Sequence, residues 1–373
     1  MKALQIGNLL APVPIVQGGM GVGISLSGLA SAVANQGGIG VISSAGLGAI
    51  YKDFSKDYRA ASIHGLKEEL RKAREATKGI IGVNVMVAMS NFADMVKTAI
   101  AEKADIIFSG AGLPLNLPSF LTAGAKTKLA PIVSSARAAK LLCNKWLSEY
   151  NYIPDAIVVE GPKAGGHLGY KKEQITDENY SLERIVPEVA AEVNAFAAAH
   201  NCHIPVIAGG GIYTGEDIYN IMQLGAEGVQ MGTRFVTTDE CDADEAFKQS
   251  YIDARQEDIE IIQSPVGMPG RAIHNSFLER VTAGLKHPTA CPFDCIKTCD
   301  MTHSPYCIML ALYNAFRGKF QNGYAFCGAN AWRADKIQSV KDLMNTLKTE
   351  YEKIPDKETL KVKLKEKLFP SKK

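Results

Sequence analysis

The chain has 373 residues and a mass of 40.2 kDa, which exceeds one average domain and fits one large barrel with an addition. Its 46% hydrophobic and 21% charged residues exclude wholesale disorder, and a net charge of +2 provides no strong field for a nucleic-acid partner. No apolar stretch reaches the roughly 18 residues of a membrane span. Because Pro12 and Pro14 interrupt the apolar region that a signal peptide needs, we expect a cytoplasmic protein.

Short β-branched runs closed by glycine or serine recur along the first 236 residues, and apolar-periodic stretches separate most of them. Nearly continuous apolar runs are typical of strands that are buried on both faces of a parallel sheet. Eight such strands that alternate with helices predict a (β/α)8 TIM barrel, an α/β fold. The predicted strands are Pro14–Gly18, Ile39–Ser43, Gly82–Met86, Asp105–Ser109, Ala130–Ser134, Ala156–Glu160, Pro205–Gly209 and Gly228–Gly232, and the predicted helices are Ser27–Asn35, His64–Thr77, Phe92–Glu102, Ala136–Tyr150, Leu182–His200 and Thr214–Leu224.

The pattern changes after Arg234, so we divide the chain into a barrel over 1–236, a mainly helical cap or substrate domain over 237–330, and a basic tail over 353–373. An amphipathic helix within 331–352 is expected to return to the barrel wall and complete it. The cap is predicted to hold an acidic helix (Asp242–Ile261), a Gly/Pro loop (Ser264–Arg271), a cysteine cluster and an apolar helix (Tyr306–Phe316).

Active sites of such barrels lie at the carboxyl ends of the strands. The seventh predicted strand ends in Gly209, Gly210 and Gly211, and the eighth is followed by Gly232 and Thr233. Glycines let backbone N–H groups approach a phosphate closely, and the helix N-terminus that follows favours negative charge. The paired loops therefore predict a phosphate site, whereas the alternative is that these glycines only permit tight turns.

The first strand leads into another glycine loop, Gly18 to Gly23, against which a flat ring can lie. Asn84 and Gln230 are amide side chains inside otherwise apolar strands. Buried amides must be hydrogen-bonded, and a heterocycle with donors and acceptors would satisfy them; an internal hydrogen bond of the barrel is the alternative.

His167 follows Gly165 and Gly166 after the sixth strand, outside any periodic helix. An imidazole in this setting suits proton transfer near neutral pH, so we predict that His167 is catalytic. The competing interpretation is a surface histidine in a flexible loop.

Five segments in one order and spacing resemble the nitronate monooxygenase (2-nitropropane dioxygenase) family and its relative, the FMN-dependent enoyl-ACP reductase II. They are Gln17–Gly21 (QGGMG), Ser109–Pro114 (SGAGLP), Ala164–Gly169 (AGGHLG), Ala208–Ile212 (AGGGI) and Gly228–Phe235 (GVQMGTRF). The resemblance implies FMN, with its phosphate at the loops of the last two strands, its ring near Gly18 to Met20, and His167 as base or proton partner. The cofactor-binding residues expected from the motifs and the resemblance together are Gly18, Gly19, Met20, Asn84, Gly165, Gly166, Gly209, Gly210, Gly211, Gln230, Gly232 and Thr233.

Four hypotheses about function remain open, and the resemblance implies the first two, which are activities on a small-molecule substrate. The first is oxidation of nitronates or nitroalkanes with His167 as base. The second is an enoyl-thioester reductase that uses NAD(P)H and FMN, with an acyl carrier protein as a partner. The third is a non-catalytic flavin or iron–sulfur sensor, and a flavin-free barrel lyase or isomerase that binds a phosphorylated substrate is a further alternative. A homodimer is the assembly that we consider.

Five of the eight cysteines fall between residues 291 and 327. Four of them are candidate ligands of an iron–sulfur cluster or zinc, although their spacing matches neither the usual zinc pattern nor the common ferredoxin pattern. The alternative is that they pack as small hydrophobic thiols. These four candidates are Cys291, Cys295, Cys299 and Cys307. The lysine-rich tail after residue 352 is interpreted as a solvated helix or frayed end, with contact to an anionic surface as the alternative.

Overall fold

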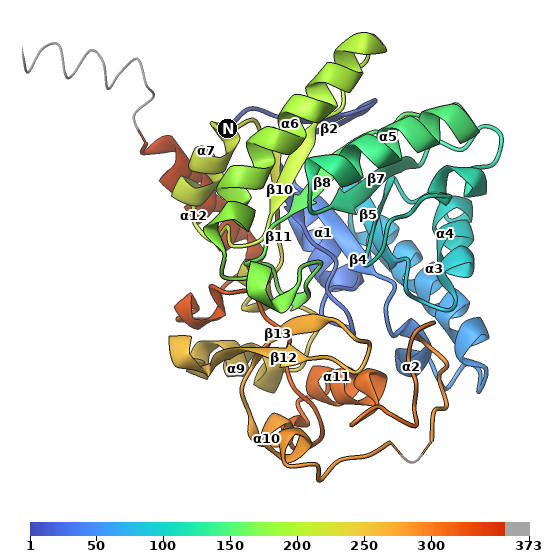
Figure 1. The fold of residues 1–373 in the computed structure, drawn as a ribbon, viewed down its shortest axis with the longest axis vertical. Helices are drawn as coiled ribbons and strands as arrows, with labels where there is room; N and C mark the ends of the chain where they lie inside the picture. Colours follow the sequence, from blue (N-terminus) through green and yellow to red (C-terminus); the bar gives the residue numbers. More distant parts are fainter. Residues whose placement is uncertain (289, 355–373) are drawn as a thin grey trace, which may run out of the picture.

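The computed structural model describes residues 1–288 and 290–354, and its centre is a closed barrel of eight parallel strands (Figure 1). Each predicted strand is present, and pairing of β11 with β3 closes the barrel. The TIM-barrel prediction is therefore confirmed. The barrel strands are β3 (Ile15–Gln17), β4 (Ile39–Ser43), β5 (Ile80–Met86), β6 (Ile106–Gly110), β7 (Lys128–Val133), β8 (Ile157–Glu160), β10 (Val206–Gly209) and β11 (Gly228–Met231).

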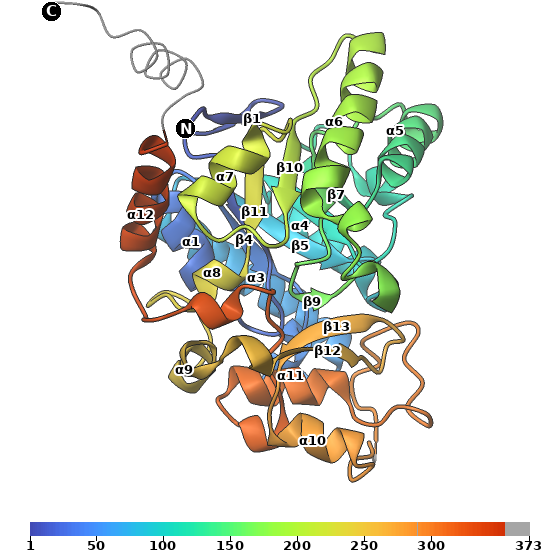
Figure 2. The ribbon, with the colours of Figure 1, turned by 60° about the vertical axis from the view of Figure 1, so that its left-hand side comes forward.

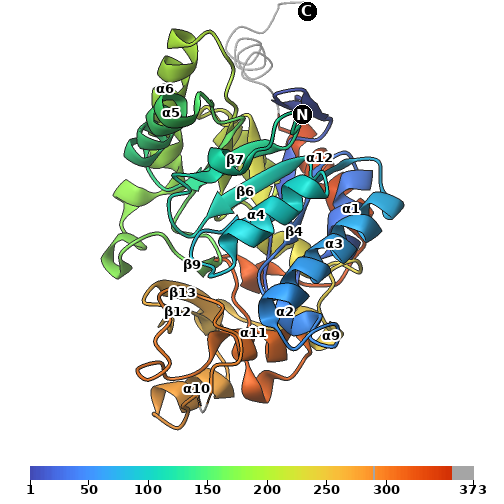
Figure 3. The same cartoon turned by 90° about the vertical axis from the view of Figure 1, so that its right-hand side faces the viewer.

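Helices cover the outside of the barrel, and N-cap side chains accept backbone hydrogen bonds at the starts of α3, α5 and α7 (Figure 3). Helices α1 and α5 have the predicted bounds, whereas α3 begins six residues before the predicted His64, because the side chain of Asp57 accepts a hydrogen bond from the backbone N–H of Arg59. The helices of this layer are α1 (Ser27–Asn35), α2 (Leu47–Ile50), α3 (Tyr58–Ala76), α4 (Phe92–Ala101), α5 (Ala136–Tyr150), α6 (Leu182–Ala199), α7 (Gly215–Met222) and α8 (Thr233–Val236).

An antiparallel hairpin of β1 (Leu4–Ile6) and β2 (Leu9–Ala11), which the sequence analysis did not predict, packs at one end of the barrel. Leu4 and Ile6 are fully buried in the same cluster as the barrel side chains Val41 and Phe108. Figure 2 shows that this hairpin and the segment after β11 lie at opposite ends of the barrel. The hairpin thus covers the end from which the strands start, and the other end remains for ligands.

The segment after β11 contains strands as well as helices. Its helices are α9 (Glu245–Asp253), α10 (Ser276–Thr282) and α11 (Ile308–Phe316), and its strands β12 (Ile259–Gln263) and β13 (Pro269–Ile273) form a three-stranded antiparallel sheet with β9 (Gly166–His167). The prediction of one helix over Asp242–Ile261 is therefore wrong beyond Asp253. The predicted loop Ser264–Arg271 is likewise shorter than expected, because its last residues pair in β13.

The last described helix, α12 (Val340–Glu352), packs on α7 and α1, as Figure 2 shows. Leu343, Met344 and Leu347 are completely buried in the main barrel core, so this helix lies against the barrel wall. Most of the predicted basic tail lies outside the described residues. In the described part of the chain, no helix is both long and apolar enough to cross a membrane.

Candidate active site

A cavity of about 480 Å³ opens at the carboxyl ends of the barrel strands. Every barrel strand, or the loop that follows it, contributes to one wall, and the segment after β11 supplies the facing wall. The barrel wall includes Gly18, Ser43, Asn84, Gly110, Val133, Glu160, Gly209 and Gln230, and the facing wall includes Val266, Met268, Ile296, Ile308, Met309, Leu312 and Phe326. One side of the cavity is therefore rich in glycine and polar groups, and the other is apolar.

The glycine loop after β10 is held open by backbone geometry. Gly210 and Gly211 have φ angles of +100° and +93°, which L side chains rarely adopt. A Cβ atom at Gly210 would lie 2.8 Å from the backbone oxygen of Gly161. Glycine is thus required here, and α7 begins four residues after Gly211 with its N-terminus capped by Thr214.

The neighbouring loop after β11 is tied to the end of the segment that follows it. The backbone N–H of Gly328 donates to Oγ1 of Thr233 at 2.9 Å, and Nδ2 of Asn330 donates to the backbone oxygen of Gly211 at 2.6 Å. These bonds hold both loops in one rigid cradle at the edge of the cavity. An anion is the ligand that such glycine loops and helix N-termini accept.

The loop after β3 lies on the barrel wall with almost no room for side chains. A Cβ atom at Gly19 would be 2.3 Å from Cβ of Asn84, and the backbone N–H of Gly18 donates to the oxygen of Met231 at 2.9 Å. The backbone N–H of Met20 donates to Oγ of Ser25 at 2.8 Å, which fixes the turn before α1.

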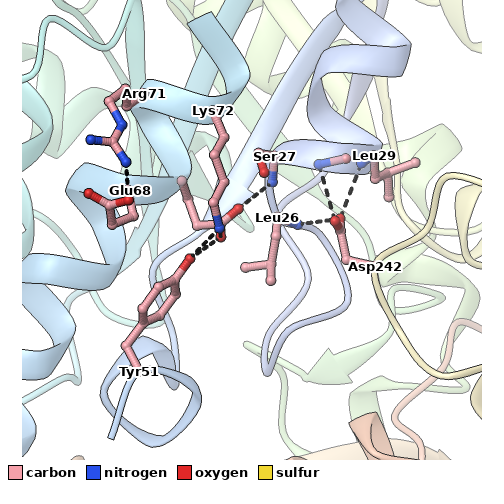
Figure 4. Close-up of polar contacts among 10 residues, drawn as sticks. Leu26, Ser27, Leu29, Tyr51, Glu68, Arg71, Lys72 and Asp242 are labelled. Carbon is pink, nitrogen blue, oxygen red and sulfur yellow. Dashed lines mark hydrogen bonds and ion pairs between the residues drawn. The ribbon is translucent and has the colours of Figure 1, made fainter. Parts of the chain in front are cut away.

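Two carboxylates secure the N-terminus of α1, which follows this loop directly (Figure 4). Asp242 accepts hydrogen bonds from the backbone N–H groups of Leu26, Gly28 and Leu29 at 2.7 to 3.1 Å. Glu69 accepts from the backbone N–H of Ser27 at 2.8 Å. Asp242 belongs to the segment after β11, so this contact also joins that segment to the barrel.

Of the three side-chain amides of Gln17, Asn84 and Gln230 in the barrel strands, one is bonded inside the barrel and two face the cavity. Gln17 is buried and bonds the backbone of Val41 in both directions, which is the internal arrangement considered as an alternative. Asn84 and Gln230 instead line the cavity, and within the described residues neither side chain has a hydrogen-bond partner. Both amides are therefore free to bind a ligand with donors and acceptors.

His167 is placed at the cavity by β9. Its backbone pairs with Gly270 of β13, its Nε2 lies 2.7 Å from Oγ of Ser264, and its ring meets Phe326 edge to face with centroids 5.0 Å apart. Burial lowers the pKa of His167 to about 4, so the imidazole is neutral at pH 7. The alternative of a surface histidine in a flexible loop is wrong, because strand pairing fixes this residue.

All twelve predicted cofactor residues and His167 line this one cavity. Sequence reasoning missed Ser264, the partner of His167, because only strand pairing brings it there across about a hundred residues. It also missed Glu160, although a carboxyl at the end of a barrel strand is itself a signal of chemistry.

The four predicted metal-ligating cysteines are free thiols in different surroundings. Cys291 is exposed, Cys295 is buried, and Cys299 and Cys307 are partly buried. In residues 1–288 and 290–354, no group of three or more His, Cys, Asp or Glu side chains is arranged to hold a metal ion. The described residues therefore provide no set of ligands for the predicted iron–sulfur or zinc site. Cys295 instead lines the cavity, and burial raises the pKa of its thiol to about 12.

A closed barrel whose cavity at the carboxyl ends of the strands is lined by glycine loops and a neutral imidazole has the architecture of a barrel enzyme. Comparison with known proteins is more specific, because the family model for nitronate monooxygenase matches residues 4–350. The chain belongs to the nitronate monooxygenase family and is an oxidoreductase.

The individual relatives have low sequence identity to this chain. A probable nitronate monooxygenase of Staphylococcus aureus (strain Newman) is 27% identical over 72% of this chain and 77% of its own length. The (3aS,4S,5R,7aS)-5-hydroxy-7a-methyl-1-oxo-octahydro-1H-indene-4-carboxyl-CoA dehydrogenase of Mycobacterium tuberculosis is 29% identical over 73% of this chain and 66% of its own length. The structure of FabK from Thermotoga maritima superimposes with a TM-score of 0.70 and 26% identity, covering 94% of this chain and 95% of that one.

Proposed function

We propose that this chain is an FMN-dependent oxidoreductase of the nitronate monooxygenase type, which oxidises nitronates or nitroalkanes with His167 as the base. The observation that carries the proposal is that a neutral imidazole and an anion cradle share one cavity. Family membership over residues 4–350 supports the same activity.

The described residues fit FMN. The loops at Gly210–Gly211 and Gly232–Thr233 would hold its phosphate, because they offer backbone N–H groups without side chains in the way. The amides of Asn84 and Gln230 would satisfy the polar edge of its ring, and the bare backbone at Gly18 and Gly19 leaves space for a flat group. FMN supplies the electron acceptor, and the chain supplies position and a proton carrier.

The chain's own part in the reaction is proton removal. A neutral His167 has one ring nitrogen with a lone pair, and the contact between its Nε2 and Ser264 fixes the orientation of the ring. In the tautomer in which Nε2 donates to Oγ of Ser264, the lone pair on Nδ1 is free. The ring can therefore accept the proton next to a nitro group. The apolar facing wall keeps water away from the acidic carbon, which strengthens every electrostatic contact inside the cavity.

A second candidate function is reduction of an enoyl thioester, with NAD(P)H as hydride source and an acyl carrier protein presenting the substrate. The observation that favours it is the apolar wall formed by Ile296, Ile308, Met309 and Leu312, which suits a hydrocarbon chain. The relative from Mycobacterium tuberculosis, which by its name is a carboxyl-CoA dehydrogenase, points in the same direction.

Anaerobic mixing separates these functions. We expect propyl-2-nitronate to bleach the flavin absorbance of the holoprotein, and His167→Ala to keep FMN and lose at least ~100-fold of the rate with nitroalkane. Bleaching by NADH or NADPH, followed by reoxidation with an enoyl thioester, would instead establish the reductase. A flavin that responds to none of these reagents would contradict both enzyme functions and favour the sensor.

A further inference from the structure

Glu160 is a carboxyl in the cavity that the proposed chemistry does not use. It is the last residue of β8 and lies beside Gly209 of β10 in the barrel. Its side chain lines the cavity, and its backbone oxygen accepts a hydrogen bond from the hydroxyl of Tyr170 at 2.6 Å. Across residues 1–288 and 290–354, its carboxyl oxygens have no hydrogen-bond partner.

Within residues 1–288 and 290–354, no cation forms an ion pair with Glu160. The flanking strands β7 and β10 end in Val133 and Gly209, neither of which is charged. The titratable side chains of the loop after β8 that share the cavity or contact Glu160 are Lys163, His167 and Tyr170, and on the outer side α6 begins with Leu182, Glu183 and Arg184. Burial raises the pKa of Glu160 to about 7, and none of these groups adds to that shift.

A buried carboxylate without a partner is costly, whereas a neutral carboxyl is tolerated and gains one donor. Among the described residues, no acceptor forms a hydrogen bond with the carboxyl of Glu160, although this residue lines the cavity. A ligand atom with a lone pair can therefore accept the hydrogen bond that the neutral carboxyl of Glu160 donates.

We propose that Glu160 is a ligand-binding residue whose neutral carboxyl donates a hydrogen bond to a carbonyl oxygen or ring nitrogen of the bound cofactor. This inference rests on the proposed function, because FMN is the ring-bearing ligand that offers such acceptors. Ionisation of Glu160 removes the donor and places a negative charge against a lone pair, so cofactor binding weakens as pH rises.

The test is the FMN dissociation constant of the apoprotein between pH 6 and 8.5, followed by flavin fluorescence. If only the protonated form binds, a group that titrates near pH 7 weakens the apparent affinity by about 30-fold over this range. Glu160→Gln keeps a neutral donor of similar shape, and we expect its dissociation constant to change less than ~3-fold over the same range. The FMN phosphate titrates equally with both proteins, so the difference between them isolates Glu160.

Glu160→Ala provides an independent comparison. It removes the donor at every pH, so we expect its FMN dissociation constant at pH 6 to be about 10-fold higher than that of the parent chain. Between pH 6 and 8.5 this constant should change no more than that of Glu160→Gln. Circular dichroism and urea unfolding of both variants establish that they fold. Parallel pH dependence in the parent chain and Glu160→Gln would overturn the inference and leave the proposed function standing. Absence of FMN binding by the folded parent chain at every pH would refute the proposed function, and the inference with it.

Discussion

Asp242 offers the sharpest test of how the segment after β11 supports the cavity. Its carboxylate accepts the backbone N–H groups of Leu26, Gly28 and Leu29 at the start of α1 (Figure 4). Asp242→Ala removes an acceptor from three N–H groups at once and removes negative charge from a helix N-terminus. Asp242→Asn keeps one acceptor oxygen and turns the other into a donor that faces an N–H group.

The expected magnitude follows from these contacts. A hydrogen bond to a charged group contributes ~1.5–3 kcal/mol, and the favourable interaction with the helix dipole adds ~0.5–1 kcal/mol. Three such bonds are not additive, and the cost of burying the carboxylate offsets part of their sum. We therefore expect Asp242→Ala to lower the free energy of unfolding by about 3–5 kcal/mol, and Asp242→Asn by about 2 kcal/mol.

The assay is urea unfolding at pH 7.5, where Asp242 is ionised, with Glu68→Gln as a matched control. In the described part of the chain, the ion pair of Glu68 is with the exposed Arg71, so its loss should cost less than ~0.5 kcal/mol. Burial raises the pKa of Asp242 to about 6, whereas an unfolded aspartate titrates near 4. The folded state thus binds more protons between these values, and the contribution of Asp242 to stability falls as pH rises from 4 to 6. An unfolding free energy of Asp242→Ala within 0.5 kcal/mol of the control would refute the capping argument.

Three further predictions concern the cavity. Gly210 has a φ of +100°, and the Cβ atom of Gly210→Ala would meet the backbone of Gly161, so this variant should lose stoichiometric FMN binding. The control is Gly124→Ala, at a φ of +80° with open space around it; it has the backbone strain without the steric clash and should keep its full flavin content after dialysis. The pKa of His167 is lowered to about 4, so the rate of nitroalkane oxidation should stay constant as pH falls from 7 to 5. A rate that is halved near pH 6.5 and falls about tenfold for each pH unit below it would show an ordinary histidine instead. Ser264→Ala removes the partner of Nε2, and we expect kcat to fall about 10-fold at unchanged flavin content, whereas an unchanged kcat would mean that Phe326 and strand pairing orient the ring alone.

The barrel could be predicted from the sequence because each of its strands has a recognisable local sequence pattern. Runs such as Ile39–Ser43 are apolar throughout and end at glycine or serine, and eight of them leave few alternatives to a closed sheet. Elements with weaker local patterns were missed. The acidic residues around Glu257 continue the helical pattern of α9 into β12, which exists only because it pairs with β13.

The candidate site could be predicted from the sequence where a residue that can bind a ligand or react lies in a strand or directly after it. The glycine loops, Asn84, Gln230 and His167 all come after or within such strands, and the barrel fold alone brings them together. Cys295 lines the same cavity and Ser264 contacts His167 there, and both belong to the segment after β11, whose path over the barrel is set by tertiary contacts. The spacing of the cysteines, likewise, did not determine how their backbone would fold.

The measurement that tests the central claim most directly is the flavin content of the purified protein and its response to a nitronate without oxygen. We predict a flavin spectrum, one FMN released per chain on heating, and stoichiometric bleaching by propyl-2-nitronate in the holoprotein. A folded protein that is colourless and takes up no FMN would contradict the account.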